Sequence, residues 1–181
     1  MPGHRGAATA SPVTRRDARK SRHLPVRVRT IEERALPLVK ELDRLARGAD
    51  PPAVKLEGAL DILFGAFSEG NEPFRQLLLE GWLRGRREKS YRLALAWLRE
   101  QLRLCVEEIL AQGVAAGAFR DDVDTAALAA VCLGAAEGCL LHSKAQGGPV
   151  PPDALVRTLL RLATRTGHSV SQDDNGRKAK P

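Results

Sequence analysis

Aromatic and β-branched residues are scarce in this chain of 181 residues. Two Trp, one Tyr and four Phe make up only 4% of it, and Leu and Ala fill most of the apolar positions. Strands favour aromatic and β-branched side chains, whereas Leu and Ala are among the strongest helix formers. The composition therefore argues against a sheet-rich protein and predicts an all-α fold.

The residues that usually carry catalysis are also few. Of the four histidines, His4, His23 and His168 lie near the ends of the chain, and only His142 lies in its central part. The sequence contains no Gly-rich phosphate loop, no HExxH or GxSxG motif, and no His paired with a carboxylate at helical spacing. We therefore expect a protein that is not an enzyme and that holds no metal and no cofactor.

The three cysteines, Cys105, Cys132 and Cys139, form no CxxC pair and no metal-like spacing with a histidine. Each falls on the apolar face of an expected helix, so we interpret them as reduced core thiols. The N-terminus lacks the apolar core of a signal peptide. The apolar run 126–141 is too short for a membrane span and carries Glu137. We therefore expect a cytoplasmic protein.

Positive charge is concentrated at the N-terminus. Residues 1–29 carry eight Arg and Lys residues and one acidic residue, Asp17, so the net charge of this segment is 8 − 1 = +7. The whole chain also has a net charge of +7, so the residues after Arg29 sum to zero. Proline, glycine and the lack of apolar periodicity predict that this segment is disordered. It is either a solvated leader or a weak contact to phosphate backbones without sequence preference. The residues of the second interpretation are Arg15, Arg16, Arg19, Lys20 and Arg22.

Six segments separated by glycine and proline breakers show the helical spacing of apolar residues. The first begins at a capping-box pair, Thr30 and Glu33, and ends at Gly48, with Pro37 marking either a kink or a later start. The others lie near residues 52–69, 72–84, 90–116, 125–143 and 153–166. This pattern predicts a bundle of about six helices in one domain, residues 30–167, with a disordered tail at 168–181.

The two helices within residues 90–141 are the most informative. The first is long and amphipathic, whereas the second, which follows the N-cap residue Asp124, is apolar or small nearly all round. A helix of that kind has to be covered on both sides. We therefore expect its own core on one side and either a further layer or a partner subunit on the other.

A particular order of residues connects these two helices. The first ends in Ile109-Leu110-Ala111-Gln112-Gly113, then come Gly117-Ala118-Phe119-Arg120 and Asp122-Val123-Asp124, and the second carries Gly134 and Gly138. From about Ile31 to Ala163 the chain resembles the C-terminal regulatory domain of the tetracycline-repressor (TetR) family of transcription regulators. The resemblance implies an N-terminal three-helix DNA-reading headpiece. Residues 1–29 do not have its pattern, so a misplaced start or a frame error is one hypothesis.

The resemblance also implies a cavity for a small apolar effector, surrounded by these helices. Aromatic side chains with a few polar groups are typical of such sites. The alternative for each of these residues is plain core packing. The candidates for the ligand pocket are Phe64, Phe67, Trp82, Trp97, Gln101 and Cys105.

The last two predicted helices of this chain resemble the pair of helices through which TetR-family proteins dimerise, and this resemblance implies a homodimer. The alternative is that their apolar faces pack on the other four helices. Glu137, among small and apolar neighbours, either has a buried partner or faces water at an edge. The candidates for the dimer interface are Leu128, Ala130, Val131, Gly134, Gly138, Leu141, Leu155 and Leu159.

Three functions follow from the sequence. The first is the ligand-sensing and homodimerisation domain of a TetR-like transcription regulator, whose DNA-reading headpiece is missing or truncated in this chain. The second is a helical dimer that acts alone as an interaction module or pairs with a full-length regulator. The third is non-specific nucleic-acid binding through residues 1–29.

Overall fold

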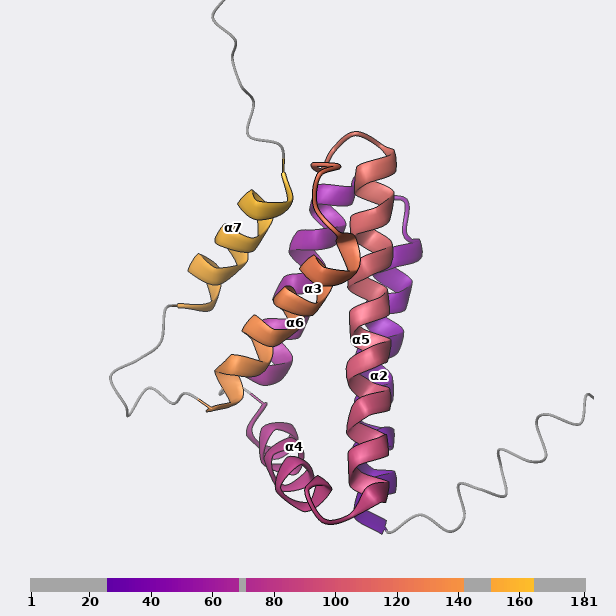
Figure 1. Ribbon diagram of the computed structural model, residues 1–181, viewed down its shortest axis with the longest axis vertical. Helices are drawn as coiled ribbons and strands as arrows, with labels where there is room; N and C mark the ends of the chain where they lie inside the picture. The colour runs from indigo at the N-terminus through magenta and orange to yellow at the C-terminus, as the bar shows by residue number, and fades with distance from the viewer. Residues whose placement is uncertain (1–25, 69–70, 142–150, 165–181) are drawn as a thin grey trace, which may run out of the picture.

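The computed structural model describes residues 26–68, 71–141 and 151–164, and this part of the chain is built from six α-helices (Figure 1). Its only β-type pairing is an isolated bridge between Phe119 and Thr164. The prediction of an all-α fold is therefore confirmed. The helices are α2 (Val26–Arg47), α3 (Pro52–Phe67), α4 (Glu72–Gly85), α5 (Lys89–Ala115), α6 (Thr125–Leu141) and α7 (Pro152–Ala163).

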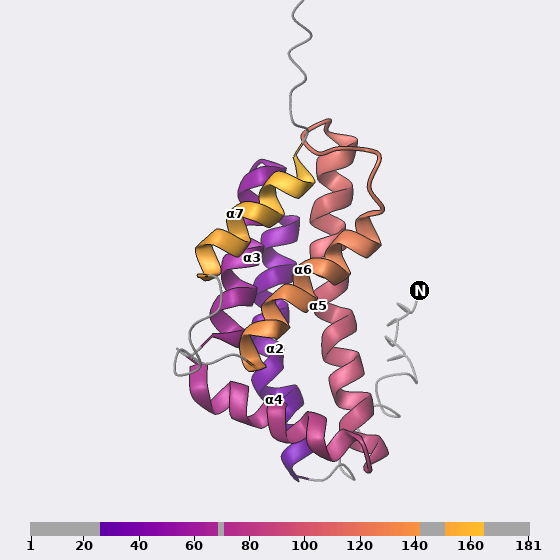
Figure 2. The same cartoon turned by 60° about the vertical axis from the view of Figure 1, so that its left-hand side comes forward.

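Helix α5, 27 residues long, is the element on which the others pack. It contacts α2, α3, α4 and α6, and α4 lies across the end of the bundle where α2 and α5 begin (Figures 1 and 2). Helix α7 packs mainly on α3. The chain therefore places α6 and α7 on one side of the bundle and α4 at one end.

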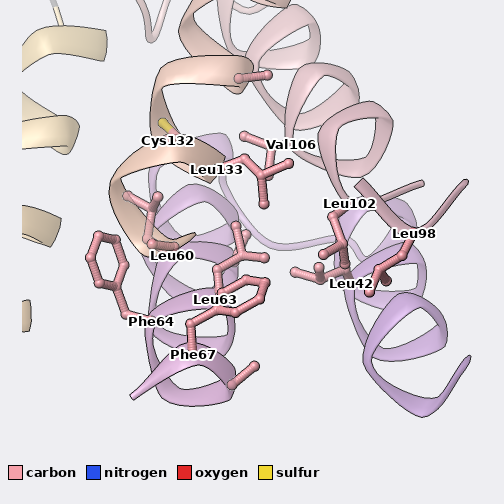
Figure 3. Packing of buried hydrophobic residues seen from close by; sticks show 14 of the residues in the cluster. Leu42, Leu60, Leu63, Phe64, Phe67, Leu98, Leu102, Val106, Cys132 and Leu133 are labelled. Carbon is pink, nitrogen blue, oxygen red and sulfur yellow. The ribbon is translucent and has the colours of Figure 1, made fainter. Parts of the chain in front are cut away.

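The apolar stripes expected from the sequence meet in a single core. Leucines of four helices are buried there, and Figure 3 shows Leu42 of α2, Leu63 of α3, Leu102 of α5 and Leu133 of α6 pointing toward one another. Burying such side chains is worth about 1.5–3 kcal/mol each relative to leaving them exposed. This shared core fixes the position of α6 against α3 and α5.

The connection from α5 to α6 is folded around Phe119, which the sequence placed in the connecting motif but did not assign to the core. Its ring is buried over Gly113, and the amides of Ala118 and Phe119 both donate to the Gly113 carbonyl. The amide of Arg120 donates to the Ala163 carbonyl at 3.0 Å. The connection therefore ties the end of α5 to the end of α7.

A buried lysine joins three helices. Lys55 of α3 donates from Nζ to the Ala46 carbonyl, in the last turn of α2, and to Gln112 Oε1 of α5, both at 2.9 Å. The Gln112 side chain also donates to the Ala46 carbonyl. A cation near a helix C-terminus is favourable, and here it satisfies a carbonyl that the helix leaves unpaired.

Several sequence predictions need correction or completion. Helix α2 begins at Val26 and passes through Pro37, so the predicted capping-box start at Thr30 is wrong. Residues 26–29, predicted to be part of a disordered segment, are helical, and the rest of that segment lies outside the described residues. Cys132 is buried, but Cys105 and Cys139 are only partly buried, and all three are free thiols. The predicted disordered tail and His142 lie outside the described residues.

Candidate ligand cleft and dimer surface

Helix α6 has one covered and one open side. Its start is fixed as the sequence predicts, because the amide of Ala127 donates to Asp124 Oδ1 at 3.0 Å. One side, with Cys132 and Leu133, packs on α3 and α5. The other side is exposed, and Val131 there has 54% of its surface exposed. The exposed positions of this side are Ala127, Ala130, Val131 and Gly134.

Helix α7 repeats this arrangement. Val156, Leu159 and Ala163 are buried, whereas Leu162 is exposed and Leu155 is half-buried. Figure 2 shows α6 and α7 on the same side of the molecule, in front of α3 and α5. We call the small and apolar residues that these two helices leave exposed the α6–α7 face; they are Ala127, Ala130, Val131 and Gly134 of α6 and Leu162 of α7.

The predicted interface residues divide between this face and the core. Ala130, Val131 and Gly134 lie on the α6–α7 face, and Gly138 and Leu155 are half-buried. Leu128 and Leu159 are buried within the chain itself and belong to its core. The side chain of Leu141 and the predicted nucleic-acid contacts Arg15, Arg16, Arg19, Lys20 and Arg22 lie outside the described residues.

A cleft of about 680 Å³ lies where the end of α4 meets the beginning of α5. Its apolar wall combines the half-buried Trp82, the exposed Leu83 and the buried Leu95. Arg92 is held at its edge, because Nη1 donates to the Gly85 carbonyl at 3.0 Å. We call it the α4–α5 cleft, and its lining residues are Trp82, Leu83, Gly85, Arg86, Arg92, Leu95, Ala96 and Arg99.

The six predicted pocket residues do not share this cleft. Trp82 lines it, whereas Phe64 and Phe67 of α3 are buried in the core (Figure 3). Trp97 is 39% exposed on α5. Gln101 and Cys105 are half-buried further along α5. A second cleft, of about 440 Å³ between α2, α3 and the start of α4, includes none of the six.

The sequence analysis missed the arginines of the α4–α5 cleft. Arg86, Arg92 and Arg99 were not among the predicted pocket residues. The spacing of Arg92 and Arg99 could have indicated that these two belong together, because residues seven apart lie on one face of a helix. Nothing local to the sequence indicates that α4 crosses that face.

One ion pair connects the cleft to α6. Arg99 Nε lies 2.8 Å from Glu137 Oε1, and the Arg99 side chain is 54% exposed while that of Glu137 is only 7% exposed. Burial raises the pKa of the Glu137 carboxyl above its ordinary value, and the charge and hydrogen bond of Arg99 offset this only in part. Of the two sequence alternatives for Glu137, the buried carboxylate with a partner is the correct one.

We expect Glu137→Gln to change how stability depends on pH. A carboxyl whose pKa is raised by folding contributes stability below its ordinary pKa of 4.5 and loses that contribution as the pH rises through the raised value. Urea unfolding between about pH 4 and pH 7 should therefore show the wild type losing stability relative to the variant as the pH increases. A difference between the two proteins that is constant with pH, or that changes in the opposite direction, would contradict this.

Burial acts on the cysteines in the same direction. It raises the pKa of the Cys132 thiol to about 11, and it also raises the pKa values of Cys105 and Cys139. Thiols of this kind are weak nucleophiles at neutral pH, because the thiolate is the reactive form. In the described residues no three His, Cys, Asp or Glu side chains are grouped as metal ligands require, and no helix is long and apolar enough to cross a membrane.

Residues 84–159 match the family of tetracyclin repressor-like C-terminal domains. The match runs from the end of α4 through α5 and α6 into α7, which is less than half of the chain. No curated protein and no solved structure matches the chain. The resemblance found from the sequence is thereby confirmed for this stretch.

Proposed function

We propose that this chain is the ligand-sensing and homodimerisation part of a transcription regulator of the tetracycline-repressor type. The observation that carries the proposal is that the cleft and the open face both lie largely within the stretch that matches the family. The matched stretch, residues 84–159, contains both the α4–α5 cleft, except for its first two residues, and most of the α6–α7 face. In this proposal, the stretch that matches a family of regulatory domains supplies the cleft for a ligand and most of the surface for a partner.

The partner in this proposal is a second copy of the chain. Two α6–α7 faces related by a two-fold axis would cover each other, since such an interface uses the same surface on both subunits. Ala130 and Gly134 allow two α6 helices to approach closely, and Val131 supplies apolar area between them. Covering exposed apolar surface of this kind is what stabilises obligate dimers.

The regulatory step in this proposal is a change in the relative positions of the two subunits. A small effector in the α4–α5 cleft contacts α4 and α5, and α5 packs on α6. An effector that binds one arrangement of these helices more tightly shifts the dimer toward it. DNA-reading heads joined to the start of α2 would then change their spacing, and with it their affinity for DNA.

A chimaeric repressor tests this function in cells. The full chain is fused behind a DNA-reading head that represses a reporter only as a dimer. We expect repression by the fusion and its loss when Gly134→Arg is introduced, with Gly65→Arg as the matched control. Repression no stronger than that of the isolated head, at equal protein levels, would overturn the proposal.

A further inference from the structure

The α4–α5 cleft combines positive charge with an apolar wall. Arg86, Arg92 and Arg99 line it, and none of its eight lining residues is acidic. The carboxylates of Glu80 and Glu88 nearby pair with Arg84, which does not line the cleft. The positive charge inside the cleft is therefore not cancelled by carboxylates in its own lining.

The apolar wall lies beside these arginines. Leu83 is 71% exposed, the largest exposed fraction among the exposed large apolar side chains of the described residues, and Trp82 and Ala96 continue the surface. A planar guanidinium binds carboxylates and other oxyanions through paired N–H groups, whereas indole and leucine side chains favour apolar groups. A purely apolar effector would contact the apolar wall and make no use of the N–H groups of the arginines.

We propose that the α4–α5 cleft binds an organic anion with an apolar body, and that Arg99 transmits its binding to α6 by exchanging Glu137 for the anionic group of the ligand. This inference rests on the proposed function, because it names the class of effector and the route of its action. The apolar body lies against Trp82 and Leu83, and the anionic group lies among the arginines.

Arg99 is suited to this exchange by its position between the two sites. Arg99 lines the cleft and its side chain is half-exposed, while its partner Glu137 is buried on α6. The printed contact of the ion pair is made by Nε of Arg99, and a guanidinium has five N–H donors in all, so in this proposal Arg99 can meet an anion in the cleft before the pair with Glu137 is broken. An incoming anion therefore meets Arg99 first and competes with Glu137 for it.

The exchange has a consequence for α6. A buried carboxylate that loses its cation is strongly unfavourable, so Glu137 must move toward water or take up a proton. Glu137 is on the same helix as Ala130 and Gly134, the open residues of the α6–α7 face. Ligand binding thus acts on the helix that carries the partner surface, and the effect is reciprocal, since a partner that holds α6 in place opposes the ligand.

Tryptophan fluorescence gives a direct test. The chain has two tryptophans, so Trp97→Phe leaves Trp82, in the cleft, as the only one. Decanoate is titrated into this variant, and methyl decanoate serves as the uncharged match of equal chain length. We expect saturable binding of decanoate that is about tenfold or more tighter than that of the ester.

Cleft variants are then compared in the same background. Arg86→Gln and Arg92→Gln should each weaken decanoate binding by about fivefold or more. Arg44→Gln, which removes an exposed arginine of α2 outside the cleft, should leave it unchanged. Equal binding of decanoate and its ester, or equal affinities of the cleft variants and Arg44→Gln, would overturn the assignment of the cleft.

Glu137→Gln tests the role of Arg99. Removing the competing carboxylate should tighten decanoate binding by about fivefold, whereas a merely structural Glu137 would leave the affinity equal or lower. In an Arg99→Lys background the same change should have a smaller effect, because a lysine cannot bridge both groups as a guanidinium does. A Glu137→Gln affinity at or below that of the parent would overturn the exchange.

Sedimentation of the same samples separates this inference from the proposed function. A dimer that binds neither probe would overturn the assignment of the cleft but would still support the proposed dimerisation. A monomer that binds decanoate through Arg86 and Arg92 would support the cleft and count against the dimer. Circular dichroism at 222 nm verifies that each variant retains its helices.

Discussion

Gly113→Ala should lower the free energy of unfolding by about 3 kcal/mol or more. A Cβ atom at this position would lie 1.9 Å from Cδ2 of Phe119 and 2.2 Å from its Cε2. The ring is buried, and the Phe119 amide donates to the Gly113 carbonyl, so neither the ring nor the backbone can retreat without losing other contacts. Urea unfolding monitored by circular dichroism measures the loss.

A matched glycine and a double variant control this result. Gly65 is exposed within α3 and a Cβ there meets nothing within 4 Å, so Gly65→Ala should raise stability by about 0.5–1 kcal/mol. In a Phe119→Ala background, Gly113→Ala should be far less harmful, since the clash is removed. A Gly113→Ala variant as stable as the wild type would show that Phe119 does not occupy the space over Gly113.

Gly134→Arg should weaken dimerisation by about 100-fold or more while leaving the subunit folded. A Cβ at Gly134 meets nothing within 4 Å in the single chain, and the position is exposed, so the subunit itself can accept a large side chain. In the proposed dimer each subunit brings one such arginine into the same apolar interface. Two desolvated like charges are strongly unfavourable there.

Gly65→Arg is the control for this substitution. It places the same side chain on an exposed glycine of α3 with the same open surroundings, at the cleft between α2, α3 and the start of α4. Sedimentation equilibrium should give the wild-type dissociation constant for Gly65→Arg and a monomer for Gly134→Arg. Equal dissociation constants for the two variants would place the interface, if any, on another surface.

The parts of the fold that the sequence predicted are those that depend on local signals. Apolar stripes and glycine and proline breakers gave six helices, and Asp124 was identified as an N-cap from its residue type and position. The start of α2 was not predicted correctly, because packing in the bundle extends the helix to Val26 beyond the local capping signal at Thr30. Tertiary contacts outweigh such local preferences when they disagree.

The parts that the sequence could not predict depend on contacts between distant residues. Phe119 contacts Gly113 and bridges to Thr164, and Lys55 reaches Gln112 of α5, and no helical period encodes these pairs. The α4–α5 cleft likewise exists only because α4 ends against the start of α5. An aromatic set was therefore predicted for the ligand site, and Trp82 alone of that set lines this cleft.

The covered and the open side of α6 illustrate both situations. The sequence indicated that small and apolar residues surround this helix, and the exposed Val131 and Gly134 agree with an uncovered side. It could not assign individual residues to the two sides, because in a helix apolar nearly all round the pattern gives no direction. Leu128 was therefore assigned to the interface, although the core of its own chain buries it.

The mass of the full chain in solution is the most direct test of the account. One chain has a mass of 19.7 kDa. Sedimentation velocity over a series of concentrations should give twice that mass for the wild type, with return to a single chain in Gly134→Arg. A wild type that remains a single chain up to the highest concentration it tolerates would contradict the proposal that the α6–α7 face is a dimer interface.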